Sequence, residues 1–117
     1  MQLNEVRFDN SPPVSGYGPG FFRVGGLVMT GAVLLLPPGP RGWVAAPAAA
    51  PIVAAADAID VLLLGMGAMI AQPPAALRQA LEVAGIGAEV MATPAACRTY
   101  NVLLAEGRRV GAALLPV

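Results

Sequence analysis

The sequence predicts a single α/β domain in which helices cover a buried sheet and a β-hairpin comes first. Three observations carry this prediction. The apolar run Val61–Leu64 lies between Asp60 and Gly65-Met66-Gly67, as expected of a strand covered on both faces. A helical pattern and another strand follow it closely, which favours a right-handed parallel crossover. Nearer the N-terminus, a Gly-Gly pair separates two runs of β-favouring residues, which is typical of a hairpin.

The length of the chain limits it to one domain. A chain of 117 residues is long enough for one hydrophobic core and too short for two, so we predict a single domain over residues 1–117. Residues 1–20 contain clusters of glycine and proline, including Gly16-Tyr17-Gly18-Pro19-Gly20. Such clusters are typical of turns, and we predict an irregular N-terminal arm there.

The first regular elements are predicted to be the strands of the hairpin. Phe21–Val24 and Leu27–Met29 flank the turn at Gly25-Gly26. The second strand is expected to bend at Gly31 and to resume over Ala32–Leu36.

The alanine-rich middle of the chain is less informative. Trp43-Val44 could form a short strand or close the edge of the core. A short helix is predicted over Ile52–Ala56, because Pro51 suits a first helical turn. The alternative is a flexible linker, but the apolar side chains of Ile52 and Ile59 favour packing.

The C-terminal half predicts two helices and two strands around the crossover. Pro73-Pro74 opens a helix over Ala75–Ala84, with an apolar stripe along one side. A strand is expected over Ile86–Met91. Thr93 as N-cap and Pro94 at the first helical position begin a second helix. That helix is expected to end at Gly107, and the last strand to span Val110–Leu115.

The residue types that are missing exclude most familiar catalytic machinery. The chain has no histidine and no lysine, and Cys97 is its one cysteine. Ser-His-Asp and Cys-His catalysis, the usual zinc sites, Schiff-base lysines and phosphate-binding P-loop lysines are therefore unavailable. We expect a protein that is not an enzyme and that has no cofactor and no bound metal.

Charge and hydropathy exclude two further classes of partner. Seven arginines balance seven carboxylates, so no basic surface is expected to bind nucleic acid. The longest apolar runs are interrupted well before the ~20 residues that a membrane-spanning helix needs. Met1–Glu5 has neither a basic nor an apolar region typical of a secretory signal. Together with the lone cysteine, which suits a reducing compartment, these features predict a cytoplasmic location.

Three short motifs invite functional interpretations that the surrounding sequence does not favour. Gly65-Met66-Gly67 resembles part of a dinucleotide-binding loop, but position 70 is Ile and the next helix starts late. Asp57 and Asp60 could be an acid–base pair, yet their position between helix and strand favours capping or solvation. Cys97 could be an activated thiol near a helix N-terminus, but its alanine-rich surroundings favour apolar filling.

The densest polar cluster is the candidate binding site. It combines Arg98-Thr99-Tyr100-Asn101 with Glu106-Gly107-Arg108-Arg109. A carboxylate near a helix C-terminus is unfavourable unless paired, so a structural Arg–Glu pair is one interpretation. The other is a site in which a guanidinium, a hydroxyl and an amide bind an anion or a partner chain. We favour the structural network, and place Gly65 and Gly67 opposite it as the wall of any cleft.

Two segments carry a resemblance to a known family. Val61–Gly67, together with the stretch Glu89–Val110 that contains Arg98-Thr99-Tyr100-Asn101 and Glu106-Gly107-Arg108, resembles the domain-of-unknown-function family of mitochondrial respiratory complex I assembly factor 3 and the adipogenesis-associated domain-containing protein. The resemblance extends over nearly the whole chain. One departure is Ala92, where the family often has an acidic residue.

The resemblance implies a fold and a role. The implied fold is a three-layer α/β domain with an N-terminal β-hairpin and a mixed central sheet of about five strands, the last antiparallel to its neighbours. The implied role is that of a protein-interaction factor without established catalytic activity. We therefore expect a non-enzymatic module that binds a protein partner, in the manner of an assembly or chaperone-like factor. The alternative is an anion-binding domain or unusual enzyme with a cleft at Arg98–Asn101.

Overall fold

Two sheets form the framework of the computed structural model, which describes residues 12–117. The smaller is antiparallel and has the order β1-β2-β3, and the larger has the order β5-β4-β8-β6-β7. The first sheet contains β1 (Val14–Gly18), β2 (Phe21–Val24) and β3 (Leu27–Thr30). The second contains β4 (Val33–Leu36), β5 (Gly39–Gly42), β6 (Val61–Met66), β7 (Ala88–Met91) and β8 (Val110–Leu115).

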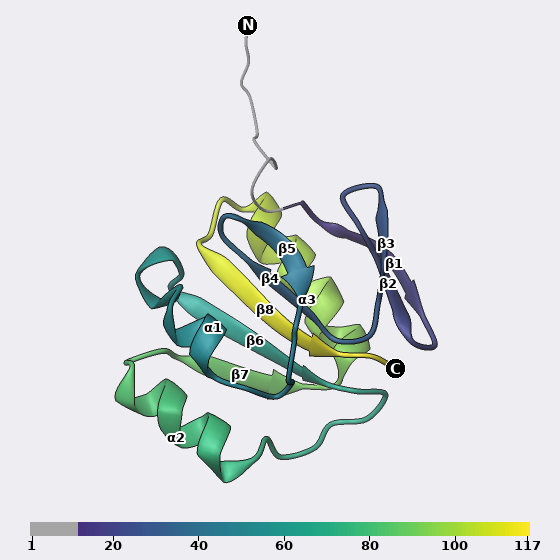
Figure 1. The fold of residues 1–117 in the computed structure, drawn as a ribbon. Helices are drawn as coiled ribbons and strands as arrows, with labels where there is room; N and C mark the ends of the chain where they lie inside the picture. The colour runs from purple at the N-terminus through teal and green to yellow at the C-terminus, as the bar shows by residue number, and fades with distance from the viewer. Residues whose placement is uncertain (1–11) are drawn as a thin grey trace, which may run out of the picture.

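Helices cover both faces of the larger sheet, as Figure 1 shows. The helices are α1 (Ala50–Val53), α2 (Ala75–Val83) and α3 (Thr93–Ala105), with a 3-10 turn, η1, at Ala56–Ala58. The side chains of β6 alternate between two cores. Leu63 packs with α3 and the small sheet, whereas Leu62 and Leu64 pack with α1 and α2. The predicted α/β class and the three-layer arrangement are therefore confirmed, and the run Val61–Leu64 is apolar because both of its faces are covered.

The predicted hairpin is confirmed as β2 and β3. Val24 pairs with Leu27 across the turn. Gly25 and Gly26 have φ of +57° and +83°, a left-handed conformation that glycine adopts without steric cost. Gly31, at φ +80°, does more than bend a strand, because it separates β3 from β4 and so sends the chain from one sheet into the other.

The prediction of an irregular arm over residues 1–20 is wrong for Val14–Gly18, which form β1 beside β2. Residues 1–11 of that arm lie outside the described part of the chain. β5 was also missed, because Gly39-Pro40-Arg41-Gly42 has turn-like composition and becomes a strand only by pairing with β4. A proline fits there because β5 is an edge strand.

The middle of the sheet is β8 rather than β6, which corrects the expectation that Val61–Leu64 is central. β8 runs parallel to β6 and antiparallel to β4. The sheet is mixed, as the resemblance implied, but the expectation that the last strand is antiparallel to its neighbours holds for β4 and is wrong for β6. β6 also pairs in parallel with β7, as the predicted crossover requires.

Between β5 and β6 the chain closes one end of the core. Trp43 is buried, and its indole Nε1 donates a hydrogen bond to the Ala48 carbonyl at 2.9 Å, so it closes the edge of the core. The predicted helix at Ile52–Ala56 is shorter and earlier, as α1 at Ala50–Val53. No helix within residues 12–117 combines the length and the hydropathy needed to cross a membrane.

Candidate functional site

The N-terminus of α3 is fixed between the ends of β6 and β8 by Thr93. Its backbone N donates to the Gly67 carbonyl at 2.7 Å. Its hydroxyl accepts from the Gly67 backbone N at 2.9 Å and donates to the Leu115 carbonyl at 2.7 Å. The predicted capping role is wrong, because Ala92 is the N-cap residue and no side chain caps the helix. The buried hydroxyl of Thr93 instead joins three segments of the chain.

Gly65 lets α3 approach β6 closely. A Cβ atom at this position would lie 2.8 Å from Thr93 Oγ1 and 2.8 Å from a methyl group of Leu114. Parallel α/β sheets often bind ligands beyond the carboxyl ends of their strands. Here that end of β6 is filled by Thr93, which is fully buried. Gly65 and Gly67 are therefore packing and turn positions in this structure.

The structure divides the predicted polar cluster on α3 between core and surface. Tyr100 is buried in the core with an exposure of 1%, whereas Arg98 is exposed and Thr99 is half-buried. Asn101 binds the backbone of β1: its Oδ1 accepts from Val14 N at 2.8 Å, and its Nδ2 donates to Val14 O at 2.7 Å. The amide thus takes the place of a neighbouring strand for the first residue of β1.

Glu106 and Arg108 are exposed just beyond α3. Within residues 12–117 no ion pair joins Glu106 to an arginine, so the predicted Arg–Glu pair is not formed there. The ion pair that this part of the chain does form involves Arg109 and Asp60, whose nearest side-chain atoms are 2.8 Å apart. Sequence analysis placed Arg109 in the polar cluster but did not predict Asp60 as its partner.

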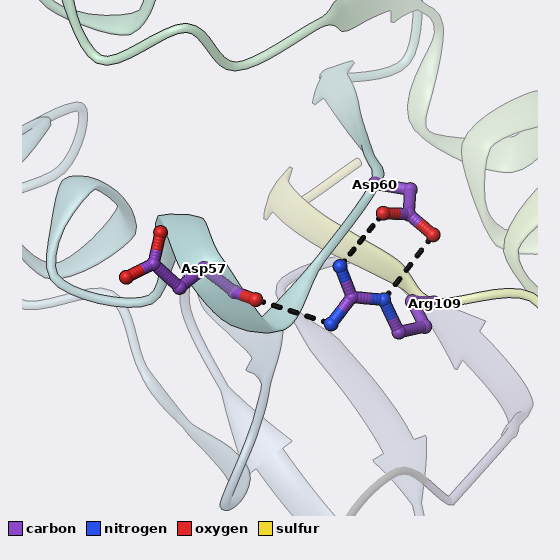
Figure 2. A network of polar contacts seen from close by, with 3 residues as sticks. All are labelled: Asp57, Asp60 and Arg109. Atoms are coloured by element: carbon purple, nitrogen blue, oxygen red, sulfur yellow. Dashed lines mark hydrogen bonds and ion pairs between the residues drawn. The ribbon is translucent and has the colours of Figure 1, made fainter.

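Arg109 joins the starts of two neighbouring parallel strands (Figure 2). Its guanidinium donates to both carboxylate oxygens of Asp60, at 2.8 and 3.2 Å, and to the Asp57 carbonyl at 3.1 Å. The hydrogen bond from Arg109 lowers the pKa of Asp60 below its usual value. Both side chains are 56% exposed, so the contact is a surface clamp rather than a buried acid–base pair. The sequence signal for this pair is a carboxylate immediately before one parallel strand, β6, and an arginine immediately before its neighbour, β8.

Cys97 is a residue of α3 whose side chain packs in the core, and it is 3% exposed. Burial raises the pKa of its thiol to about 11. A thiol that is protonated and covered is a poor nucleophile, which supports the interpretation of Cys97 as apolar filler.

The described residues also line a hollow that sequence analysis did not predict. It has a volume of about 250 Å³ and lies between α2 and the neighbouring strands β6 and β7. Its apolar wall consists of Leu64, Leu81, Ile86, Ala88 and Val90. Arg78 and Glu82 of α2 also line it. None of the residues predicted as a site contributes to it.

Comparisons with known proteins give a consistent picture. A family model described as "Protein of unknown function (DUF498/DUF598)" matches residues 14–115. An uncharacterized protein of Rhodobacter capsulatus is 48% identical over 117 residues, which are 100% of this chain and 94% of that protein. A crystal structure of a Bartonella henselae protein, described as an outer membrane protein, superposes with a TM-score of 0.86 at 35% identity, covering 95% of this chain and 99% of the other.

A relative with a descriptive name is more distant. NADH dehydrogenase (ubiquinone) 1 alpha subcomplex assembly factor 3 of Danio rerio is 32% identical over 110 residues. The match covers 88% of this chain and 63% of the fish protein, so this chain spans less than two thirds of that relative.

Proposed function

Because this chain belongs to the DUF498/DUF598 family, we propose that it is a non-enzymatic interaction module that assists assembly of the NADH dehydrogenase of the respiratory chain. The observation that carries the proposal is the 32% identity to the Danio rerio assembly factor across 88% of this chain. The family that the sequence resembled is confirmed, and the role implied by it becomes the function proposed for this chain. A protein partner follows from that role.

The surface of the molecule supports a role in protein contacts. Met69 and Ile70, in the connection from β6 to α2, are 78% and 67% exposed, and Val83 at the end of α2 is 90% exposed. Val83 ends α2, whereas the connection enters the helix at its start, so the adjacent side chains of Met69 and Ile70 are the exposed apolar pair that a protein partner could cover. The proposal keeps a cytoplasmic location, because the single Cys97 suits a reducing compartment.

Several of the groups predicted from the sequence as a binding site are engaged in contacts within the protein and are not available to a ligand. Both ends of the Asn101 amide are used by Val14, and Gly65 is in contact with Thr93. Arg98 is exposed on the outside of α3. An anion site at Arg98–Asn101 therefore has less support than the interaction module.

The proposal can be tested in Rhodobacter capsulatus. Deletion of the gene for the 48% identical relative is expected to lower the amount of assembled NADH dehydrogenase in membranes, measured by native gel electrophoresis and by NADH:quinone activity. Expression of this chain in the deletion strain is expected to restore both. Succinate:quinone activity is the control for general membrane damage. Unchanged NADH dehydrogenase in the deletion strain would contradict the proposed function.

A further inference from the structure

The outer edge of β7 carries backbone groups that can accept another strand. β7 ends the order of the larger sheet, with β6 on its inner side. Leu62 N donates to Gly87 O at 2.9 Å. In a parallel pair, every second residue of a strand directs both its N–H and its C=O to the neighbouring strand, and the residues between them direct theirs to the other side. Because Gly87 faces β6, the N–H and C=O groups of Ala88 and Val90 point away from β6. An edge of this kind is a template for strand addition.

The side chains of Ala88 and Val90 connect that edge to the hollow beside α2. Ala88 is paired with Leu62 and Val90 with Leu64, and those leucines pack on the α2 side of the sheet. Both β7 residues accordingly line the hollow. Residues directly opposite each other on neighbouring strands place their side chains on the same face. A strand added to β7 would therefore direct alternate side chains into the hollow.

The size of the hollow suits side chains better than a separate ligand. Its volume is about 250 Å³, whereas sites for drug-sized molecules have roughly 300–1,000 Å³. The apolar wall formed by Leu64, Leu81 and Val90 favours aliphatic or aromatic groups. Peptide recognition by strand addition has this form: the main chain gives affinity and pockets for alternate side chains give specificity.

Glu89, which lies between Ala88 and Val90 in β7, determines which charge is preferred at the middle residue of an added strand. It is exposed, and it pairs with Leu63, so its side chain lies on the opposite face from the hollow. Opposite charges across neighbouring strands are stabilising and like charges are destabilising. The residue facing Glu89 on an added strand is therefore favoured to be lysine or arginine.

The same residue disfavours a second copy of this chain as the occupant. In an antiparallel pair of β7 strands, the register in which Ala88 and Val90 of both copies exchange hydrogen bonds places Glu89 directly opposite Glu89. Two carboxylates would then face each other at the centre of the contact, which is unfavourable. A strand of different sequence avoids this conflict.

We propose that β7 binds an extended segment of a partner protein as an additional strand, with an apolar residue, a basic residue and another apolar residue in succession. The two apolar side chains enter the hollow beside α2, and the basic one faces Glu89. This inference rests on the proposed function, because it identifies the surface and the partner chemistry through which an interaction module would act.

Selection from a random decapeptide library on phage, against the immobilised full chain, tests the proposal. The enriched peptides are expected to share the apolar–basic–apolar pattern. Synthetic versions are then measured by fluorescence anisotropy, together with copies that carry N-methyl groups on their backbone amides. N-methylation is expected to abolish binding, because methylated amides cannot pair with a strand. Peptides with helical spacing of their apolar residues would overturn the proposal.

Variants of β7 separate edge pairing from general surface adhesion. Ala88→Pro removes an outward N–H, which an edge strand tolerates, and is expected to weaken peptide binding roughly tenfold or more. Glu89→Lys is expected to reverse the preference for the central residue from basic to acidic. Arg41→Glu, an exposed charge reversal on β5 at the opposite edge of the same sheet, is the matched control and should leave affinity unchanged. Circular dichroism and thermal unfolding verify that each variant is folded.

Unaltered binding by folded Ala88→Pro, or an unaltered central-residue preference in Glu89→Lys, would overturn the proposal. A dimer of the free chain that Ala88→Pro dissociates, measured by light scattering, would also overturn it in favour of self-pairing. The deletion experiment reads a different quantity. If this chain restores NADH dehydrogenase but selects no strand-like peptide, only the β7 proposal fails. If it selects such peptides but deletion leaves NADH dehydrogenase unchanged, only the proposed function fails.

Discussion

Thr93 and Gly67 bind each other twice: the Thr93 backbone N donates to Gly67 O at 2.7 Å, and Gly67 N donates to the Thr93 hydroxyl at 2.9 Å. The hydroxyl then continues to the Leu115 carbonyl at 2.7 Å. This arrangement fixes the beginning of α3 to the ends of two parallel strands. It explains why the carboxyl end of β6 is a packed junction in this fold.

Thr93→Val is expected to destabilise the protein by about 2 kcal/mol, because it leaves the partly buried Gly67 N–H and Leu115 carbonyl without their partner. The two side chains have similar volume, so the effect isolates the hydroxyl. Thr93→Ser keeps the hydroxyl and is expected to retain more of the stability. Urea unfolding followed by circular dichroism measures both variants. Equal stability of wild type and Thr93→Val would show that the bridge contributes nothing.

Gly65→Ala is expected to cost about 1–3 kcal/mol through overpacking. The added methyl group would meet Thr93 Oγ1 and Leu114 at 2.8 Å, so α3 must move away from the sheet. Gly42→Ala on edge strand β5 is a suitable control, since a methyl group added there would meet nothing within 4 Å. Urea midpoints give the comparison, and a Gly65→Ala protein as stable as the control contradicts the packing argument.

Asn101→Ala is expected to loosen β1 from α3 and to reduce stability by about 1–2 kcal/mol, because Val14 loses both backbone partners. Amide hydrogen exchange should accelerate at the start of β1 more than in β6 or β8. Val102→Ala, at the neighbouring exposed position, controls for a general change in the helix. Unchanged protection of Val14 would contradict the role given to the amide.

The Asp60–Arg109 clamp gives a pH dependence of defined sign. Because the hydrogen bond from Arg109 holds the pKa of Asp60 in the folded chain below its ordinary value, folding favours the ionised carboxylate. The contribution is fully present above the pKa of the unfolded chain and is lost as the pH falls through the lowered pKa of the folded state. The difference in unfolding midpoint between wild type and Asp60→Asn should therefore shrink as the pH is lowered from about 6 to about 2. A difference that grows over this range would reverse the assigned sign.

Cys97 is expected to resist alkylation in the folded protein. The thiol is 3% exposed, and its pKa is raised to about 11 by burial, so little thiolate is present or accessible near neutral pH. Mass spectrometry after iodoacetamide treatment should show slow labelling of native protein and rapid labelling in urea. Equal rates would place the thiol at the surface.

The elements predicted correctly are those with a strong local pattern. α2 has a regular apolar stripe, and β6 and β8 are unbroken apolar runs between turn signals. β1 and β5 have turn-like compositions rich in glycine and proline, which conceal that each pairs with the adjacent strand along the chain, β1 with β2 and β5 with β4. The first residue of β1, Val14, is also held by Asn101, which is 87 positions away. Local sequence contains no trace of that contact.

The candidate site was less predictable for the same reason. Thr93-Pro94 has the local features of a helix cap, but the hydroxyl is taken by strand ends 22 and 26 positions away. Arg109 belongs to the predicted polar cluster, but its partner Asp60 was not identified, because 49 positions separate the two residues. The hollow beside α2 depends on how far a helix stands from an edge strand, which residue types alone do not specify.

The position of β8 in the middle of the larger sheet has a consequence for synthesis on the ribosome. β4 and β6 are made earlier, yet each pairs with β8, so the nascent chain has two separate halves of a sheet until residues 110–115 emerge. During that interval the apolar edges of both halves lack their common neighbour. The sheet can therefore close only after translation of β8, and a ribosome stalled upstream of it would hold a chain whose larger sheet lacks its middle strand.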